Sequence, residues 1–251
     1  MITIEIDGEI PSAEQVWATV SSYGHFTALQ VRDGKTRGLA LHLRRLESAT
    51  KEAFGVPLDL DRVRALIRRA LGATKDGSVR VYLFEGSHDP RVVVTVKPPA
   101  QIESPQRLRS VPYRRPSPHI KHVTTDQGFY RRRAQQEGAD DALLTYDDGT
   151  VCETTMANIG FLDASGVVWP EAEMLRGITM QLLEEALPRR DVPTRRIPIR
   201  AADISSFEGA FLSNARGIAA VSRIDGAELA TPVDRLSDLL DAYASLPWDA
   251  I

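Results

Sequence analysis

A proline-rich stretch near the middle of the chain constrains its fold more than any other feature. Between Lys97 and Pro118 the regular spacing of apolar residues is lost, and prolines recur at positions 98, 99, 105, 112, 116 and 118. Such a stretch resists helix interiors and central strands, because proline has no backbone N–H and clashes with the preceding turn. The sequence therefore predicts a smaller N-terminal α/β domain over residues 1–112, a connector at 113–119 and a larger domain over 120–251.

Strand and helix patterns alternate on the N-terminal side of this stretch. Runs rich in β-branched and aromatic residues predict strands at 2–6, 26–31, 79–84 and 91–96. Apolar residues at helical spacing predict helices at 42–54 and 58–71. We expect these elements to form a domain built on one sheet.

The pattern restarts after the stretch. A helix is expected from about Thr124 to Glu137, where Gly138 ends it, and further helices at 177–187 and 233–246. Strands are expected at 142–146, 150–153, 157–163, 167–169, 195–199, 208–213 and 218–224. Asp147-Asp148-Gly149 is typical of a hairpin turn between the first two of these strands. This half therefore also predicts an α/β domain built on a sheet.

Composition narrows the classes of function. Of the 251 residues, 43% are hydrophobic, which is enough to form a substantial core. The formal net charge is -3, so the composition gives no reason to expect a nucleic acid partner. The single cysteine, Cys152, excludes an internal disulfide, and the five histidines form no cluster with metal-ligand spacing. No signal peptide or spanning segment is evident, so we expect a cytoplasmic protein with neither metal nor membrane.

Lys121 directly follows the proline-rich stretch, within Ile120-Lys121-His122. A lysine whose pKa is depressed can lose its proton and attack the aldehyde of a cofactor such as pyridoxal phosphate. A lone lysine is more often a solvated surface residue. The candidate assignment therefore depends on the pattern that follows Lys121 in the chain.

Glu153 ends a predicted strand in an apolar and hydroxyl-rich setting, Val151 to Ala157. A carboxylate there needs a partner, and the pyridinium nitrogen of pyridoxal phosphate would serve, because the ion pair keeps the ring protonated and able to accept electrons. The alternative is an exposed glutamate at a strand end. Asn158, five residues further on, is a candidate to order the glutamate or its loop.

Two short segments could bind a phosphate group. Gly177, Ile178 and Thr179 begin a predicted helix, where backbone N–H groups lack intrahelical partners and a hydroxyl is nearby. A second donor set follows a predicted strand and comprises Ser213, Asn214 and Ala215. Taken alone, this second segment is only a turn.

These motifs, in this order, resemble the class IV aminotransferases, which include branched-chain and D-amino acid aminotransferases and aminodeoxychorismate lyases. The resemblance covers nearly the whole chain. Its supports are Tyr23-Gly24, His42 to Leu46, Ile120 to His122, Asp148 to Glu153 with Asn158, Leu175 to Thr179, and Phe211 to Ala215. The resemblance implies an α/β (α+β) fold with the two-domain, D-amino acid aminotransferase-like architecture of fold type IV pyridoxal phosphate enzymes.

The resemblance also implies roles for individual residues. Lys121 would form the Schiff base with pyridoxal phosphate and carry the proton between the substrate and the cofactor. Arg45 would contact the phosphate, together with the Gly177–Thr179 and Ser213–Ala215 segments, and Glu153 would bind the ring nitrogen. The family further implies a homodimer in which each active site is completed by the partner, acting on a small amino substrate.

Departures from the family pattern leave the reaction open. Branched-chain enzymes keep a tyrosine five residues after the lysine, whereas this chain has Asp126. Aminodeoxychorismate lyases also lack a tyrosine at this position, which favours the lyase. The segment Val79 to Gly86 lacks the Arg-Gly ending found in many lyases and D-amino acid enzymes. The residue that binds the substrate carboxylate is therefore unassigned. The candidate substrate contacts, each of which could instead be structural, are Tyr23, Arg80, Tyr82 and Arg216.

The expected function is transfer of an amino group between an amino acid and a 2-oxo acid through Lys121. One alternative is a 4-amino-4-deoxychorismate lyase, which releases pyruvate and 4-aminobenzoate. Another is a degenerate family member that binds pyridoxal phosphate without turnover. An intact Lys121 and Glu153 argue against the last of these.

Overall fold

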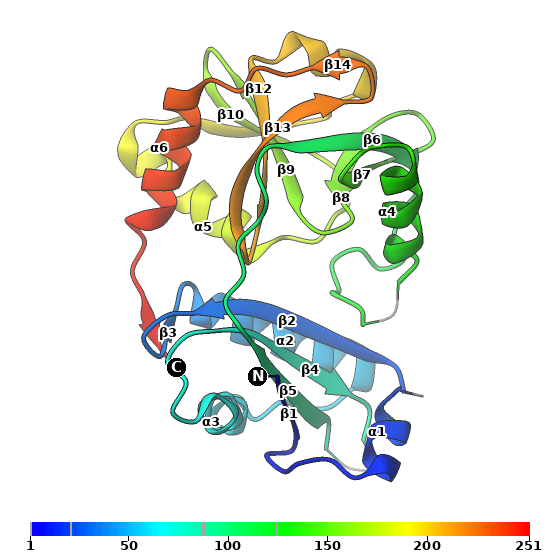
Figure 1. Ribbon diagram of the computed structural model, residues 1–251, viewed down its shortest axis with the longest axis vertical. Helices are drawn as coiled ribbons and strands as arrows, with labels where there is room; N and C mark the ends of the chain where they lie inside the picture. Colours follow the sequence, from blue (N-terminus) through cyan, green and yellow to red (C-terminus); the bar gives the residue numbers. More distant parts are fainter. Residues whose placement is uncertain (1, 21, 87–88, 124) are drawn as a thin grey trace. The chain divides into compact units, whose positions relative to one another are not determined.

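The computed structural model describes residues 2–20, 22–86, 89–123 and 125–251, and the chain divides into two compact units (Figure 1). Unit 1 comprises residues 1–100, 120–124 and 247–251, and unit 2 comprises 101–119 and 125–246. Residues 101–112, which we assigned to the N-terminal domain, group with unit 2. The Lys121 segment groups with unit 1.

Unit 1 is built on an antiparallel sheet in the order β1-β5-β4-β2. Its strands are β1 (Thr3–Ile6), β2 (Gly24–Val31), β4 (Gly77–Phe84) and β5 (Arg91–Lys97). The short strands β3 (Lys35–Thr36) and β15 (Asp249–Ala250) pair with each other. The helices are α1 (Ala13–Val20), α2 (Leu39–Phe54) and α3 (Leu60–Leu71).

Helices α2 and α3 cover one face of this sheet. Side chains alternate between the two faces of a strand, so every second residue of β2, β4 and β5 points to the helices. The buried cluster on this face includes Leu29, Val81 and Val94 from the strands, Leu46 from α2 and Ile67 from α3. The opposite face presents the intervening residues, among them Phe26, Arg80 and Tyr82.

Helix α1 was not expected from the sequence. Its start carries a capping box, in which the Ser12 N–H donates to Gln15 Oε1 at 2.8 Å and the Gln15 N–H donates to Ser12 Oγ at 3.2 Å. This reciprocal pattern is legible as Ser-x-x-Gln in the sequence. We did not predict the helix because the residues after Ser12 do not show apolar side chains at regular helical spacing. Trp17, the largest apolar side chain of the helix, is 74% exposed.

Unit 2 is built on a nine-stranded mixed sheet in the order β11-β10-β9-β12-β13-β6-β7-β8, with β14 paired to β13. The strands are β6 (Gln106–Pro112), β7 (Asp141–Thr145), β8 (Val151–Thr154), β9 (Asn158–Asp163), β10 (Gly166–Pro170), β11 (Thr194–Ile197), β12 (Gly209–Asn214), β13 (Gly217–Ile224) and β14 (Ala227–Glu228). The helices are α4 (Gln127–Gln136), α5 (Ile178–Ala186) and α6 (Val233–Ala244), with short 3-10 helices η1 (Pro188–Arg190) and η2 (Ala201–Ser206).

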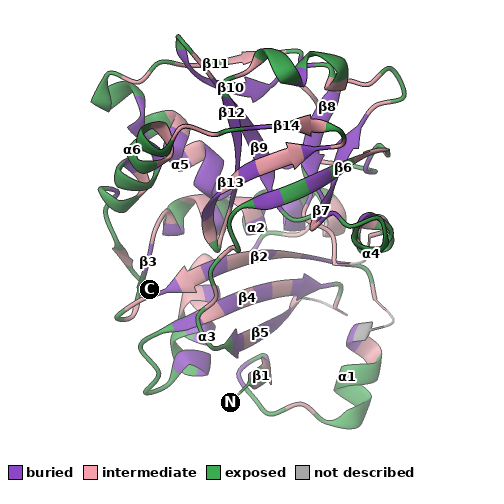
Figure 2. Ribbon diagram, turned by 45° about the horizontal axis from the view of Figure 1, so that its top comes forward, coloured by how far each residue is buried: buried purple, intermediate pink, exposed green. Residues whose placement is uncertain are grey.

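The core of unit 2 is apolar and built mainly from strands. Leu143, Ile159, Phe161, Leu212 and Val221 belong to one buried cluster that several strands share. Strands β8, β9 and β10 are almost wholly buried (Figure 2). Helix α4 packs beside β6 and β7, whereas α5 and α6 pack on each other and against β12 and β13 (Figure 1).

Strand β6 corrects an expectation drawn from the prolines. We expected no strand between residues 97 and 118, yet residues 106–112 form a strand that pairs in parallel with both β13 and β7. Pro105 precedes the strand and Pro112 is its last residue, so the interior residues keep the N–H groups that both ladders need. Prolines at the two ends of a strand are therefore compatible with a central position in a sheet.

Helix α4 begins at Gln127, later than expected, with Asp126 at its N-cap, and Thr124 lies outside the described residues. The other expected helices and strands are present, with ends that differ by at most three residues. Across the described ranges, no helix combines the length and apolar composition needed to cross a membrane.

Two buried histidines link β2 to α2 in unit 1. His25 Nε2 lies 3.1 Å from Thr50 Oγ1, and His42 Nδ1 lies 2.7 Å from Thr27 Oγ1. The pKa of His25 is lowered to about 4, mainly by burial and secondly by the charge on His122. The pKa of His42 is lowered to about 3, mainly by burial and secondly by the charge on Arg45. Both side chains are therefore neutral in the folded protein near pH 7.

We expect acid to destabilise unit 1 through these histidines. Below an ordinary histidine pKa of about 6.5 the unfolded chain binds a proton that folded His42 does not bind, so stability is lost as the pH falls. From pH about 7 to about 5, His42 alone should remove about 2 kcal/mol of unfolding free energy. Urea denaturation at both pH values measures this loss.

His42→Gln should lose less stability over that pH interval than the parent does. His119→Gln is the matched control, because His119 is exposed. An acid-side loss that is the same in the parent and in His42→Gln would show that His42 does not cause it.

Candidate functional site

Residues 121–123 extend the sheet of unit 1 along the edge of β2. The Phe26 N–H donates to the Lys121 carbonyl and the Val123 N–H donates to the Gly24 carbonyl, each at 2.9 Å, while His25 stands opposite His122. Strand β2 is the last strand in the sheet order, so its outer edge is available for this pairing. The segment that carries Lys121 is thereby held by backbone hydrogen bonds.

This pairing places Lys121 directly opposite Phe26, on the same face of the sheet. Lys121 is partly buried, and its Nζ lies 5.0 Å from the centroid of the Phe26 ring. At that distance the ring face attracts the ammonium form of the side chain. The lysine singled out from the sequence is therefore not a freely solvated surface residue.

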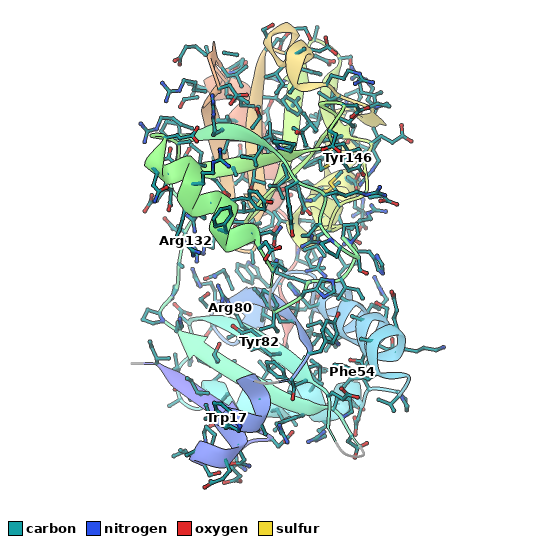
Figure 3. All side chains as sticks on the ribbon, turned by 90° about the vertical axis from the view of Figure 1, so that its right-hand side faces the viewer. Trp17, Phe54, Arg80, Tyr82, Arg132 and Tyr146 are labelled. Atoms are coloured by element: carbon teal, nitrogen blue, oxygen red, sulfur yellow. The ribbon has the colours of Figure 1, made fainter. Side chains whose placement is uncertain are left out.

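Arg80 and Tyr82 lie on this face as well, as neighbours on β4 (Figure 3). Arg80 Nη1 donates to the Tyr82 hydroxyl at 3.2 Å, and Arg80 Cζ lies 5.8 Å from the centroid of the Phe26 ring. The rings of Phe26 and Tyr82 stack with their centroids 5.2 Å apart. The sheet thus brings two candidate substrate contacts together with Lys121.

The other two candidates in unit 1 lie close to α2. The Tyr23 hydroxyl lies 2.6 Å from His122 Nδ1, and the Tyr23 ring packs edge-on against Phe54, with 45% of the tyrosine exposed. Arg45 lies on α2, close enough to His42 to lower its pKa. The roles proposed for Tyr23 and Arg45 remain predictions.

In unit 2, Glu153 lies at a buried strand end on β8, 5% exposed. Arg115 forms an ion pair with it, with Nε 3.3 Å from Glu153 Oε1, and the Leu175 N–H donates to the same oxygen at 3.3 Å. We did not identify Arg115 from the sequence. It lies in the segment expected to be a connector, and no spacing pattern relates it to Glu153.

Asn158 orders the loop that leads into α5. Its Nδ2 donates to the Leu175 carbonyl at 2.7 Å, and its Oδ1 accepts the Gly177 N–H at 3.0 Å. A Cβ added at Gly177 would lie 2.0 Å from Asn158 Oδ1, so only glycine fits there without displacing the asparagine. Glu153 and Asn158 thus hold the Leu175–Gly177 loop from two points.

The candidate phosphate segments lie together in unit 2. Strand pairing sets Ser213 opposite Asn158, and Thr179 Oγ1 donates to the Asn214 carbonyl at 2.7 Å. Within the described chain, no side chain caps the start of α5 and the buried Ser213 Oγ has no hydrogen-bond partner. A helix N-terminus and an unsatisfied hydroxyl are both groups that a phosphate oxygen could satisfy. Ala215 follows directly in the turn between β12 and β13.

Arg216, the fourth candidate substrate contact, belongs to this part of unit 2 and not to the face that carries Lys121. Its backbone N–H donates to Asn214 Oδ1 at 2.7 Å. It also lines a polar cavity of about 170 Å³, together with Gln106, Arg131 and Asp141. Arg216 therefore belongs to unit 2, whereas the other three candidates for substrate binding belong to unit 1.

Known proteins resemble this chain over almost its full length. A bifunctional aminodeoxychorismate lyase / D-amino acid transaminase of Mycobacterium tuberculosis is 26% identical, over 96% of this chain and 98% of the relative. Among solved structures, the pyridoxal phosphate-bound form of a hypothetical aminotransferase from Mycobacterium tuberculosis superposes with a TM-score of 0.82 at 23% identity, covering 98% of this chain and 99% of the other.

A branched-chain aminotransferase from Thermoproteus uzoniensis superposes with a TM-score of 0.83 at 20% identity, over 96% of this chain and 93% of the other. At these identities the superpositions show a shared fold, the one expected from the sequence. The family model for class IV amino-transferases matches residues 24–224, a span that includes every candidate site residue except Tyr23. The chain therefore belongs to the class IV aminotransferase family and has the two-unit architecture of fold type IV pyridoxal phosphate enzymes.

Proposed function

We propose that this enzyme is a pyridoxal phosphate-dependent aminotransferase that moves an amino group between an amino acid and a 2-oxo acid. The observation that carries the proposal is the grouping on the sheet of unit 1. Lys121 Nζ and the Arg80 guanidinium both lie within 6 Å of the Phe26 ring. An amine that can react and a guanidinium that can bind a carboxylate are the two groups that an amino acid substrate requires.

The donor set of unit 2 fits pyridoxal phosphate. The uncapped start of α5 and the unsatisfied Ser213 hydroxyl suit the phosphate group. The contact of Arg45 with the phosphate stays an expectation from the family. The buried carboxylate of Glu153 suits a protonated ring nitrogen. Gly177 lets the start of α5 pack directly against Asn158, because a side chain at that position would collide with the asparagine Oδ1.

When bound, pyridoxal phosphate supplies an electron sink for the bond broken at the substrate α carbon. The residues of this chain do the rest. Glu153 would hold the proton on the ring nitrogen, and Arg80 with Tyr82 would orient the substrate carboxylate. Lys121 would hold the cofactor through Nζ until the amino group of the substrate displaces it, and the freed amine would then take the proton from the substrate α carbon and pass it on.

One observation favours a second candidate, a 4-amino-4-deoxychorismate lyase. Asp126 occupies the position where branched-chain enzymes keep a tyrosine, and it lies exposed at the N-cap of α4. The name of the Mycobacterium tuberculosis relative includes this lyase activity beside a D-amino acid transaminase activity. Both reactions would use Lys121 and Glu153, and they differ in the product released.

The two functions are separated by following products. The purified protein with added pyridoxal phosphate is mixed with L- and D-amino acids plus a 2-oxo acid, or with aminodeoxychorismate. We expect a visible absorbance band of the bound cofactor and formation of a new amino acid in the first mixture. Lys121→Ala should remove the band and lower turnover by at least about 10³-fold, because the nucleophile is lost.

Lys75→Ala is the matched control, since the Lys75 side chain is 79% exposed and pairs only at the surface with Asp33. Release of 4-aminobenzoate and pyruvate without amino transfer would establish the lyase instead. A lysine-dependent band with no product from any substrate would favour a non-catalytic binder. A cofactor band that persists in Lys121→Ala would contradict the central assignment.

Arg80→Gln tests substrate binding separately from catalysis. Losing a charge-assisted hydrogen bond to a carboxylate should raise KM for the amino acid by roughly 10-fold to 100-fold, with a smaller effect on kcat. Steady-state kinetics measures both constants. Arg69→Gln, on the exposed surface of α3, is the control. An unchanged KM in Arg80→Gln would mean that another residue binds the carboxylate.

We also propose a homodimer, as membership of the family implies. Sedimentation velocity over a range of protein concentrations should give the mass of two chains. A monomer that retains full cofactor binding and activity would show that the chain needs no partner copy.

A further inference from the structure

We infer that Arg115 is a positioning residue of the cofactor site, one that keeps the Glu153 carboxylate charged and aimed at the ring nitrogen of pyridoxal phosphate. The inference rests on the proposed function, because it assigns a role to a residue that acts through Glu153. Both residues belong to unit 2.

Both side chains of the Arg115–Glu153 pair are buried. The Arg115 side chain is 5% exposed and the Glu153 side chain is 7% exposed, with Arg115 Nε 3.3 Å from Glu153 Oε1. The neighbouring Arg114 provides the contrast, because its side chain is 67% exposed and pairs with the exposed carboxylate of Glu173. Two adjacent arginines therefore have opposite environments, and only Arg115 reaches the buried carboxylate.

Burial decides what this contact does. A charged carboxylate in an apolar setting is unstable unless a cation or several donors stabilise it, and otherwise it takes up a proton. A protonated Glu153 could not hold a second proton on the ring nitrogen by charge. Arg115 therefore supplies the positive charge that keeps the carboxylate ionised when no cofactor is bound.

The surroundings of the pair restrict its movement. A terminal nitrogen of Arg115 donates to the Pro118 carbonyl, so the guanidinium is held by its own segment as well as by Glu153. The Leu175 N–H donates to Glu153 Oε1 from the loop before α5. Pro116 and Pro118 limit the backbone conformations around Arg115. The proline-rich segment thus presents a rigid arginine to the carboxylate.

The test measures affinity for pyridoxal phosphate by equilibrium dialysis of the full-length protein, which requires no turnover. We expect Arg115→Gln to weaken binding by roughly 30-fold, as is typical when one partner of a buried charge pair is removed. Arg115→Lys should recover much of that loss because it keeps the charge. Arg114→Gln, the matched control, should bind like the parent.

The pH profile separates this role from a purely structural one. In Arg115→Gln, the buried carboxylate should take up a proton more readily, so affinity should fall more steeply than in the parent between pH about 9 and about 6. In a Glu153→Gln background, which has no carboxylate to ionise, Arg115→Gln should change the affinity by less than about twofold.

The outcomes distinguish this inference from the proposed function. If Glu153→Gln binds the cofactor like the parent, the assignment of Glu153 fails and the proposed function loses its support in unit 2. If Glu153→Gln weakens binding but Arg115→Gln does not, or if the Arg115→Gln effect is undiminished without Glu153, only the role of Arg115 is overturned. Circular dichroism and thermal melting identify any variant that fails to fold, and Arg115→Lys then carries the test.

Discussion

The chemistry proposed for this enzyme depends on two backbone hydrogen bonds between residues 121–123 and the edge of β2. Through these bonds, residues 121–123, which follow the proline-rich stretch, pair with β2 and extend the sheet of unit 1. Strand geometry then decides which way each side chain points, so Lys121 shares a face with Phe26, Arg80 and Tyr82. A shift of one residue in this pairing would send the lysine to the opposite face.

Unit 2 uses a different device, a loop held by buried polar side chains. Glu153 accepts the Leu175 N–H, while Asn158 bonds both the Leu175 carbonyl and the Gly177 N–H. Buried polar groups that are fully partnered specify one conformation, because each alternative leaves a donor or acceptor unsatisfied. The start of α5 is therefore fixed by the same residues that flank the proposed ring nitrogen site.

Much of the fold could be predicted from the sequence, because strands such as β4 and helices such as α3 have strong periodicity. The exceptions have physical causes. Strand β6 was missed because prolines at its ends disguised a run that the ladders of β13 and β7 stabilise. Helix α1 was missed because it is mostly exposed. The homodimer and the cytoplasmic location stay predictions, since a single chain carries no observation that tests either.

By itself, the sequence determined the family and the residue types that carry its chemistry, because a lysine, a glutamate and a glycine-led helix start are recognised by identity and order. Tertiary structure alone decided which residues became neighbours. Arg115 and Glu153 meet in unit 2, to which Arg216 also belongs, and Lys121 joins Arg80 and Tyr82 in unit 1. The reason is that strand pairing and burial act between residues far apart in the chain, where local periodicity carries no information.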